Sequence, residues 1–214
     1  AACADAVLAT VAMLAADGKA VQAAAAHSFG GKVLLAARAR APWIQTWMLD
    51  STPGARPTLL SDPSSSGVAR VLESLRALRH ATPVWPSREA FVSAFVARGH
   101  ESTVATWLAT NLVSNDAGGG GYVNRLDADI LAELLADYAR LDLWPQVTDA
   151  GAPGDMVFVI AGKSSTWPAD ERAIAIDLAA HDPRVHTDII ETADHWLHVD
   201  APREVIAAFA RRLP

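Results

Sequence analysis

The sequence predicts an α/β fold in which a mostly parallel sheet is flanked by helices and interrupted by a helical insertion. A short apolar strand, a tight turn and a helix follow one another around Ser28. The apolar run 156–161 is unbroken, which is typical of a parallel strand buried on both faces. Four helical patterns lie in succession between these two regions. We therefore expect the two ends of the chain to build the sheet and the middle to form the insertion.

The length, charge and composition of the chain exclude several classes of function. The 214 residues suffice for one domain with a large insertion. The net charge of -6 argues against a general nucleic-acid binder, which would present a basic face. Cys3 is the only cysteine, which excludes an internal disulfide and a cysteine-based metal site. No apolar run approaches the length of a membrane span, and the sequence says nothing about the oligomeric state.

The core is predicted to comprise residues 1–54 and 148–214. In the first segment we expect a helix over 4–16, a strand over 19–26, a helix from Ser28 to about Arg40 and a strand over 43–49. In the second we expect a strand over 156–161, a helix over 169–180, a strand over 185–190, a loop over 193–200 and a helix over 202–213. Breakers such as Gly18 and Pro42 separate these patterns.

The middle of the chain, residues 55–147, reads as the helical insertion. Its patterns predict helices over 68–79, 87–98, 102–112 and 127–141. Ser87 follows a proline and suits the N-cap of the second of these helices. A block of this kind, placed between two halves of a sheet, is expected to act as a cap or lid.

Ser28 is the candidate nucleophile. A serine at the apex of a strand–turn–helix unit matches a nucleophile elbow, which projects the hydroxyl from the sheet edge. The small residues Ala26 and Gly30 fit the crowding where the helix crosses the strand end. The backbone amide of Phe29, at the start of the helix, would point toward an anion formed at Ser28. The alternative is a plain buried strand-to-helix turn with no catalytic role.

His195 is the candidate base. It lies in the loop after the last predicted strand and before the last helix, where a base must lie to reach the elbow of such a sheet. His198 is the local rival. His27 neighbours the serine, but adjacent side chains on an elbow point apart, so we expect His27 to pack.

The orienting acid has two candidates. Asp50 ends the strand that follows the helix of Ser28, a position where open α/β sheets place functional residues. The loop after strand 156–161 contains no carboxylate before Asp170. We favour Asp50 over Asp170. Asp194 is too close in sequence to His195 to orient its ring.

Three separated segments resemble the α/β-hydrolase superfamily: HSFGGK from His27, WMLDSTPG from Trp47 and ADHWLHVDAP from Ala193. They are similar to the small serine hydrolases related to bacterial YbfF-type esterases and a mammalian group of abhydrolase-domain proteins, and further to plant and algal members. The resemblance implies Ser28 as nucleophile, His195 as base and Asp50 as acid. It also implies that Phe29 lends its amide to the oxyanion hole, and that no metal or organic cofactor takes part.

The chain departs from that pattern in three places. Ala26 and Asp194 each replace a glycine of the family. An extra carboxylate beside His195 is expected to favour the charged form of its ring. Residues 1–27 match neither the family's first strands nor the loop that supplies its second oxyanion amide. We therefore expect a fragment or a truncated product of weak or no activity. The plant-like resemblance allows a plastid location.

The predicted activity is hydrolysis of a carboxylic ester or thioester through an acyl-enzyme on Ser28. Two alternatives stay open: carbon–carbon bond cleavage by the same residues, and a non-catalytic protein that binds a ligand or partner. Epoxide and haloalkane hydrolases of this fold use an aspartate nucleophile, so Ser28 argues against both. Cap aromatics are expected to roof an acyl pocket, unless they simply pack: Phe91, Phe95, Trp107, Tyr138 and Trp144. The candidate pocket residues are His27, Trp107, Trp144 and Trp196.

Overall fold

The computed structural model describes residues 2–59, 67–116, 119–149 and 151–213. The chain divides into two compact units. The core unit joins residues 1–55 to residues 141–214, and the helical unit contains residues 56–140. Each unit has a hydrophobic core of its own, so each is described by itself.

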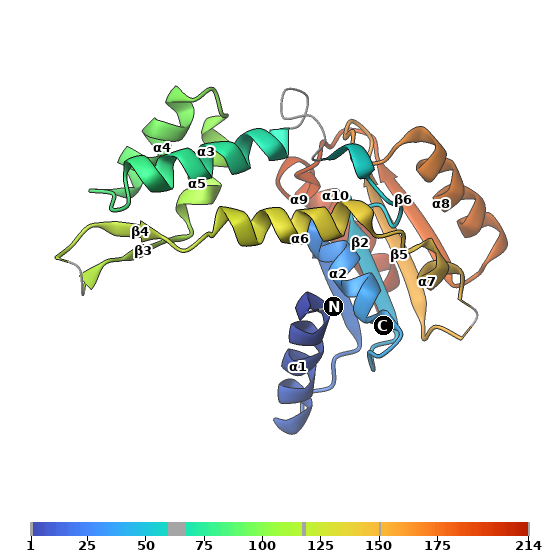
Figure 1. Cartoon of the computed structure of the whole chain (residues 1–214). Helices are drawn as coiled ribbons and strands as arrows, with labels where there is room; N and C mark the ends of the chain where they lie inside the picture. Colours follow the sequence, from blue (N-terminus) through green and yellow to red (C-terminus); the bar gives the residue numbers. More distant parts are fainter. Residues whose placement is uncertain (1, 60–66, 117–118, 150, 214) are drawn as a thin grey trace. The chain divides into compact units, whose positions relative to one another are not determined.

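The core unit is built on a parallel sheet with the strand order β1-β2-β5-β6 (Figure 1). All three strand pairs in this sheet are parallel. The connections between parallel strands run through helices, as the alternating pattern of the sequence predicted. The strands are β1 (Ala23–His27), β2 (Gln45–Leu49), β5 (Asp155–Ala161) and β6 (Val185–Ile190).

Helices cover both faces of the sheet, which explains the unbroken apolar sequence of β5. Val157 and Val159 face a cluster that contains residues of α9 (Leu197–Asp200) and α10 (Pro202–Arg212). Phe158 and Ile160 face the opposite cluster. Helices α2 (Phe29–Arg38), α7 (Trp144–Thr148) and α8 (Ala169–His181) contribute to that second cluster (Figure 1). Because successive residues of a strand point to opposite faces, β5 needs apolar side chains at every position.

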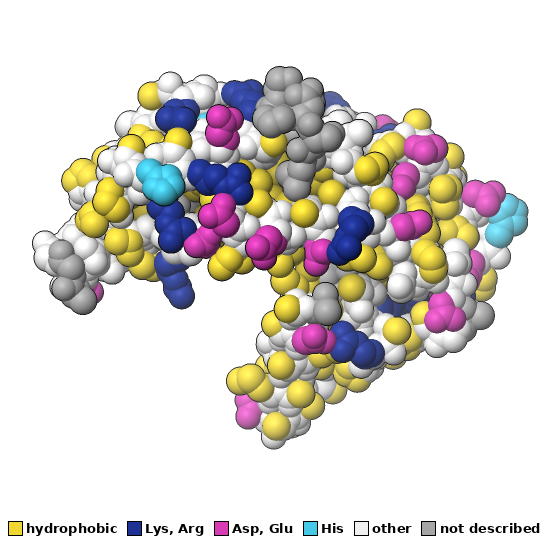
Figure 2. Space-filling view, in the orientation of Figure 1, with side chains coloured by type: hydrophobic (Ala, Val, Ile, Leu, Met, Phe, Trp, Pro, Cys, Tyr) yellow, Lys and Arg dark blue, Asp and Glu magenta, His cyan; other side chains and the backbone are white. Residues whose placement is uncertain are grey.

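Helix α1 (Ala2–Ala16) packs against α2 at the β1 edge of the sheet. Ala4 and Val11 are buried against Leu34 and Trp43. The remaining surface of α1 is rich in small apolar side chains, and Figure 2 shows them in yellow along this helix. No helix among the described residues combines the length and the hydropathy of a membrane span.

The helical unit is a bundle with one small hairpin. Its helices are α3 (Gly67–Ala81), α4 (Arg88–Ala97), α5 (Ser102–Ala109) and α6 (Ala128–Arg140), with a 3₁₀ turn at Pro57–Leu59. Strands β3 (Leu112–Ser114) and β4 (Tyr122–Asn124) form the antiparallel hairpin. The Ser87 hydroxyl accepts a hydrogen bond from the amide of Ala90, as its N-cap position predicted.

The order and type of the long elements agree with the sequence prediction, but several boundaries differ. The insertion was expected to end at residue 147, whereas the helical unit ends at Arg140. Residues of α7 belong to the core because Leu143 and Val147 are buried against the sheet. The β3–β4 hairpin and α9 were not expected. Three-residue strands and a four-residue helix are too short to show a periodic pattern.

Candidate active site

Three side chains far apart in the sequence meet at the carboxyl ends of the parallel strands. The Ser28 hydroxyl lies 3.0 Å from Nε2 of His195. Nδ1 of the same ring lies 2.7 Å from Oδ2 of Asp50. With its proton on Nδ1, the ring donates to Asp50 and accepts from the serine hydroxyl. This is the geometry in which an imidazole can take a proton from an alcohol.

Ser28 lies on a strained turn between β1 and α2. Its φ of 54° and ψ of -123° belong to a region that residues with a side chain rarely adopt. The turn also needs small neighbours. A Cβ on Gly30 would lie 3.0 Å from that of Ala26, and a Cβ on Gly31 would lie 2.6 Å from that of Ser51. These close approaches keep the hydroxyl projecting from the strand end.

Asp50 is fully buried, yet its carboxylate is well supplied with donors. The register pairs Leu49 with Val159, which places the next residue, Asp50, beside the end of β5. The amide of Ala161 donates to Oδ1 at 3.1 Å, and the Ser164 hydroxyl donates to Oδ2 at 2.6 Å. Because a buried polar group is costly without partners, these donors offset the cost of burying the side chain.

The loop after β5 contributes two residues that the sequence analysis missed. Ser164 donates to Asp50 and accepts a hydrogen bond from the amide of Thr166. The Thr166 hydroxyl lies 3.1 Å from Nδ1 of His195. The loop carries no carboxylate before Asp170, and the Ser164 hydroxyl supports Asp50 instead. The useful signal was its run of hydroxyl residues at the strand end next to Asp50, since neighbouring parallel strands end at one edge.

The loop that carries His195 is held from both sides. Nε2 of His27 donates to the backbone carbonyl of His195 at 2.7 Å, and the two rings lie 4.6 Å apart. The ring of Trp196 lies 5.6 Å from that of His27. The Asp194 carboxylate accepts the amide of His195, so it caps the backbone and makes no bond to the ring. His198 packs its ring against His27.

The pKa of His27 is lowered below its usual value, chiefly because burial disfavours the charged ring. The unfolded chain therefore binds more protons than the folded chain at pH values below about 6.5. We expect the free energy of unfolding to be highest above that pH and to fall as the pH drops toward the folded-state pKa. Urea unfolding at pH 8, 6.5 and 5 would measure this.

The variant His27→Phe provides the comparison, because it fills the same space with a ring that does not titrate. The difference in unfolding free energy between the native chain and this variant is expected to move in favour of the variant as the pH falls. A difference that stays constant from pH 8 to pH 5 would contradict the assignment.

Two side chains, those of Lys32 and Glu171, anchor the loop that follows Asp50. Nζ of Lys32 donates to the carbonyl of Gly54 at 2.6 Å and to that of Leu141 at 2.9 Å. The Glu171 carboxylate of α8 accepts from the amide of Gly54 and from the Thr52 hydroxyl. The lysine of the HSFGGK segment thus ties the elbow helix to the acid-bearing loop.

Two further residues proposed from the sequence, Asp170 and Trp144, make no contact with the His195 ring among the contacts of the described residues. Asp170 is exposed in the first turn of α8, whereas the His195 ring contacts Asp50. Trp144, expected in the insertion, belongs to the core unit: its ring packs on Phe158, and its Nε1 donates to Glu171.

The cap aromatics do not form one set. Phe91 and Phe95 are buried in the core of the helical unit, stacked on each other and near Trp85. Tyr138 is also buried, whereas Trp107 is half exposed on α5. Packing therefore accounts for Phe91 and Phe95, and a contact of Trp107 with substrate stays a prediction. The described residues contain no cluster of three or more His, Cys, Asp or Glu side chains that could hold a metal ion.

Residues 1–208 match the profile of the alpha/beta hydrolase family. The chain belongs to this family. A comparison with curated protein sequences gives no match. Family membership supports a hydrolase and accounts for the parallel sheet with its flanking helices.

Solved structures agree with the hydrolase fold of this chain. A marine microorganism esterase superposes with a TM-score of 0.75 at 17% identity, covering 94% of this chain and 73% of that one. An E-2-(acetamidomethylene)succinate hydrolase gives 0.66 at 19% identity, with 97% and 71% covered. An esterase of Mycobacterium tuberculosis gives 0.59 at 19% identity, with 98% and 68% covered. At these identities the likeness establishes the fold alone.

Proposed function

We propose that this chain is a serine hydrolase that cleaves carboxylic esters or thioesters through an acyl-enzyme on Ser28. One observation carries the proposal: the continuous hydrogen-bonded series from Ser28 through His195 to Asp50, with contacts of 3.0 and 2.7 Å. The strained backbone at Ser28 supports it, because strain of this kind accumulates at functional sites. Two of the structural neighbours named above are esterases, which fits the proposed class.

The proposed reaction has two halves. In the first, Nε2 of His195 takes the hydroxyl proton while Ser28 attacks the carbonyl carbon, and the same proton then goes to the departing alcohol or thiol. In the second, His195 takes a proton from water, which attacks the acyl carbon; the bond to Ser28 then breaks, the acid leaves, and His195 returns the proton to the Ser28 oxygen. Asp50 keeps the ring in the productive tautomer and stabilises its charged form in both halves.

The tetrahedral intermediate needs donors for its oxyanion. The amide of Phe29, the first residue of α2, is proposed as one of them. The helix N-terminus also favours negative charge at this place. A single oxyanion donor is worth roughly 100- to 1,000-fold in rate.

The proposed branch within the family rests on the three segments HSFGGK, WMLDSTPG and ADHWLHVDAP. We place the chain in the branch of YbfF-type esterases because Lys32 and the Asp50–Pro53 spacing accompany the serine and the histidine. His27 and Trp196 line the proposed acyl pocket, since both rings lie beside His195.

A fluorophosphonate probe tests the proposal directly. We expect one adduct, on Ser28, mapped by mass spectrometry of the digested chain. Labelling is expected to disappear in His195→Ala, because the hydroxyl then has no base. Unlabelled protein would then be assayed on a panel of acyl esters and acyl thioesters. The absence of an adduct on Ser28, or an adduct that persists in His195→Ala, would contradict an activated serine.

Ser164 is proposed as a positioning residue for Asp50. Replacing it by alanine leaves one oxygen of a buried carboxylate without its hydroxyl donor. We expect kcat to fall roughly 10- to 100-fold with little change in KM, since a lost charge-assisted hydrogen bond costs about 1.5–3 kcal/mol.

Ser164→Thr retains the hydroxyl and is expected to recover much of the rate. The neighbouring Ser165 is exposed, so Ser165→Ala serves as the matched control and is expected to leave kcat unchanged. An equal loss in both alanine variants would contradict the assigned role.

A further inference from the structure

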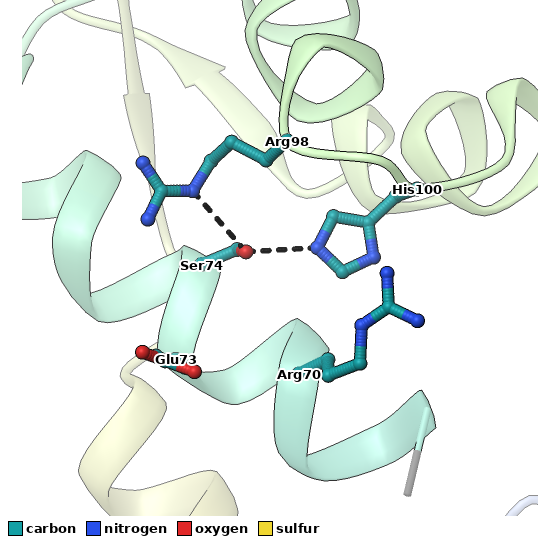
Figure 3. Close-up of a pocket in the computed structure, with 5 residues that line it drawn as sticks. All are labelled: Arg70, Glu73, Ser74, Arg98 and His100. Atoms are coloured by element: carbon teal, nitrogen blue, oxygen red, sulfur yellow. Dashed lines mark hydrogen bonds between the residues drawn. The ribbon is translucent and has the colours of Figure 1, made fainter. Parts of the chain in front are cut away.

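The helical unit contains a polar pocket that the proposed hydrolysis does not use. It has a volume of about 270 Å³. Its walls come from α3 and from the turn between α4 and α5 (Figure 3). The lining side chains are Arg70, Glu73, Ser74, Arg98 and His100.

The buried Ser74 hydroxyl lies at the centre of this group. Nε of Arg98 donates to it at 3.3 Å, and Nε2 of His100 lies 2.8 Å from it. Figure 3 shows the arginine on one side of the hydroxyl and the histidine on the other. Nη2 of Arg70 donates to the carbonyl of Gly99 at 3.2 Å, which holds that guanidinium at the same turn. These contacts place Arg98 and His100 at Ser74, and Arg70 at Gly99.

Positive charge in this pocket is not balanced by ion pairs. On the same helix, Arg76 and Arg79 each pair with an aspartate of α6 or its N-terminus. Among the described residues, neither Arg70 nor Arg98 forms an ion pair with a carboxylate. Glu73 lines the pocket, but Figure 3 shows its carboxylate pointing away from Ser74.

The pKa of His100 agrees with this excess of positive charge. Its pKa is lowered below the usual value, first by burial and then by the positive charges of Arg70 and Arg98. Two guanidinium groups therefore lie close enough to the ring to disfavour a third positive charge. An anion bound among them would relieve that repulsion and would favour protonation of the ring.

We propose that Arg70, Arg98 and His100 form a binding site for a phosphate group. A guanidinium group can form bidentate hydrogen bonds to two oxygens of a phosphate, and the imidazole supplies a further donor. The oxygens would occupy the pocket beside Ser74, which has Arg98 on one side and His100 and Arg70 on the other. The site lies wholly within the helical unit, so it does not depend on the reaction proposed at Ser28.

The test is an NMR titration of the histidine ring protons of the whole chain at constant ionic strength. The His100 resonance is assigned by its loss in His100→Gln. Inorganic phosphate is expected to shift it with saturation at millimolar concentrations. Glycerol phosphate is the second ligand: tighter binding than inorganic phosphate would indicate a phosphorylated small molecule, and weaker binding would indicate the free ion. No saturable shift with either ligand would overturn the proposal.

A titration with sulfate tests the role of the His100 ring. The charge of sulfate does not change near neutral pH, so any pH dependence of its binding comes from the protein. Bound sulfate is expected to raise the pKa of His100, so by linkage the sulfate affinity rises as the pH falls through that pKa. His100→Gln is expected to remove this dependence while retaining affinity at high pH. A sulfate affinity that does not vary with pH would contradict a role for the ring.

Arg70→Ala and Arg98→Ala are each expected to weaken phosphate binding about tenfold or more, through loss of charge-assisted hydrogen bonds. Arg70→Lys keeps the positive charge but cannot make a bidentate hydrogen bond, so an intermediate loss of phosphate affinity is expected. Arg76→Ala is the matched control, because Arg76 lies on the same helix but outside the pocket. An equal loss of phosphate affinity in Arg76→Ala would mean that the anion responds only to the overall charge of the surface, and it would overturn the proposed site. Far-ultraviolet circular dichroism confirms that each variant is folded.

Discussion

Ser28→Ala is expected to reduce kcat/KM for ester hydrolysis by about ten-thousandfold or more. The variant removes the only atom that can form the acyl-enzyme, while leaving substrate binding in place. The measurement is steady-state hydrolysis of a chromogenic acyl ester, with single-turnover kinetics to find any remaining activity. The exposed Ser165→Ala is the matched control and is expected to retain full activity.

The stability of variants at this position provides an independent check. Ser28 has a φ of 54°, a conformation that glycine adopts at little cost. Ser28→Gly is therefore expected to be inactive and yet at least as resistant to urea as the native chain. An inactive and strongly destabilised Ser28→Gly would mean that loss of folding explains the loss of activity. Retention of native activity in Ser28→Ala would remove the serine from the mechanism.

Asp50→Asn is expected to reduce kcat by roughly 1,000- to 10,000-fold. The asparagine has nearly the same shape, so its carbonyl oxygen can replace Oδ1 and still accept a hydrogen bond from the amide of Ala161, while its amide nitrogen replaces Oδ2 beside Ser164 and His195. Its amide group, however, donates to the His195 ring and favours the wrong tautomer. The base is then protonated on the nitrogen that faces Ser28 and cannot accept the hydroxyl proton.

Asp170→Asn is the matched control, because sequence reasoning left Asp170 as the alternative acid. It lies exposed at the start of α8 and is expected to change kcat by less than about twofold. Both variants would be compared by kcat, KM and urea midpoint. A large loss in Asp170→Asn, with Asp50→Asn near native activity, would reverse the assignment of the acid.

The contrast between these two carboxylates shows where sequence reasoning stops. Both follow predicted strands, and the sequence favoured Asp50 without placing either carboxylate beside His195. The decision lies in the register of β2 against β5, which pairs Leu49 with Val159 and brings Asp50 to the amide of Ala161. Register depends on side chains more than a hundred residues apart, and a local pattern carries no information on that pairing.

The same limit explains Ser164, Lys32 and the phosphate pocket. The role of Ser164 follows from its distance to Asp50, across 114 residues of sequence. Lys32 is buried, and the carbonyls of Gly54 and Leu141 accept hydrogen bonds from its Nζ, a pairing that no local pattern predicts. Arg70 lies on α3 and Arg98 follows the end of α4, so the two line one pocket only because these segments pack together.

The sequence by itself determined the α/β class, the order of the long elements, the elbow at Ser28 and the candidate status of His195. These follow from local physics: apolar periodicity, residues that break helices, and the small side chains that a sharp turn requires. Tertiary structure alone decided which acid faces His195, which hydroxyl supports that acid, and that Trp144 packs in the core unit. Each of these depends on contacts between distant segments, which form only when strand register and helix packing bring the segments together.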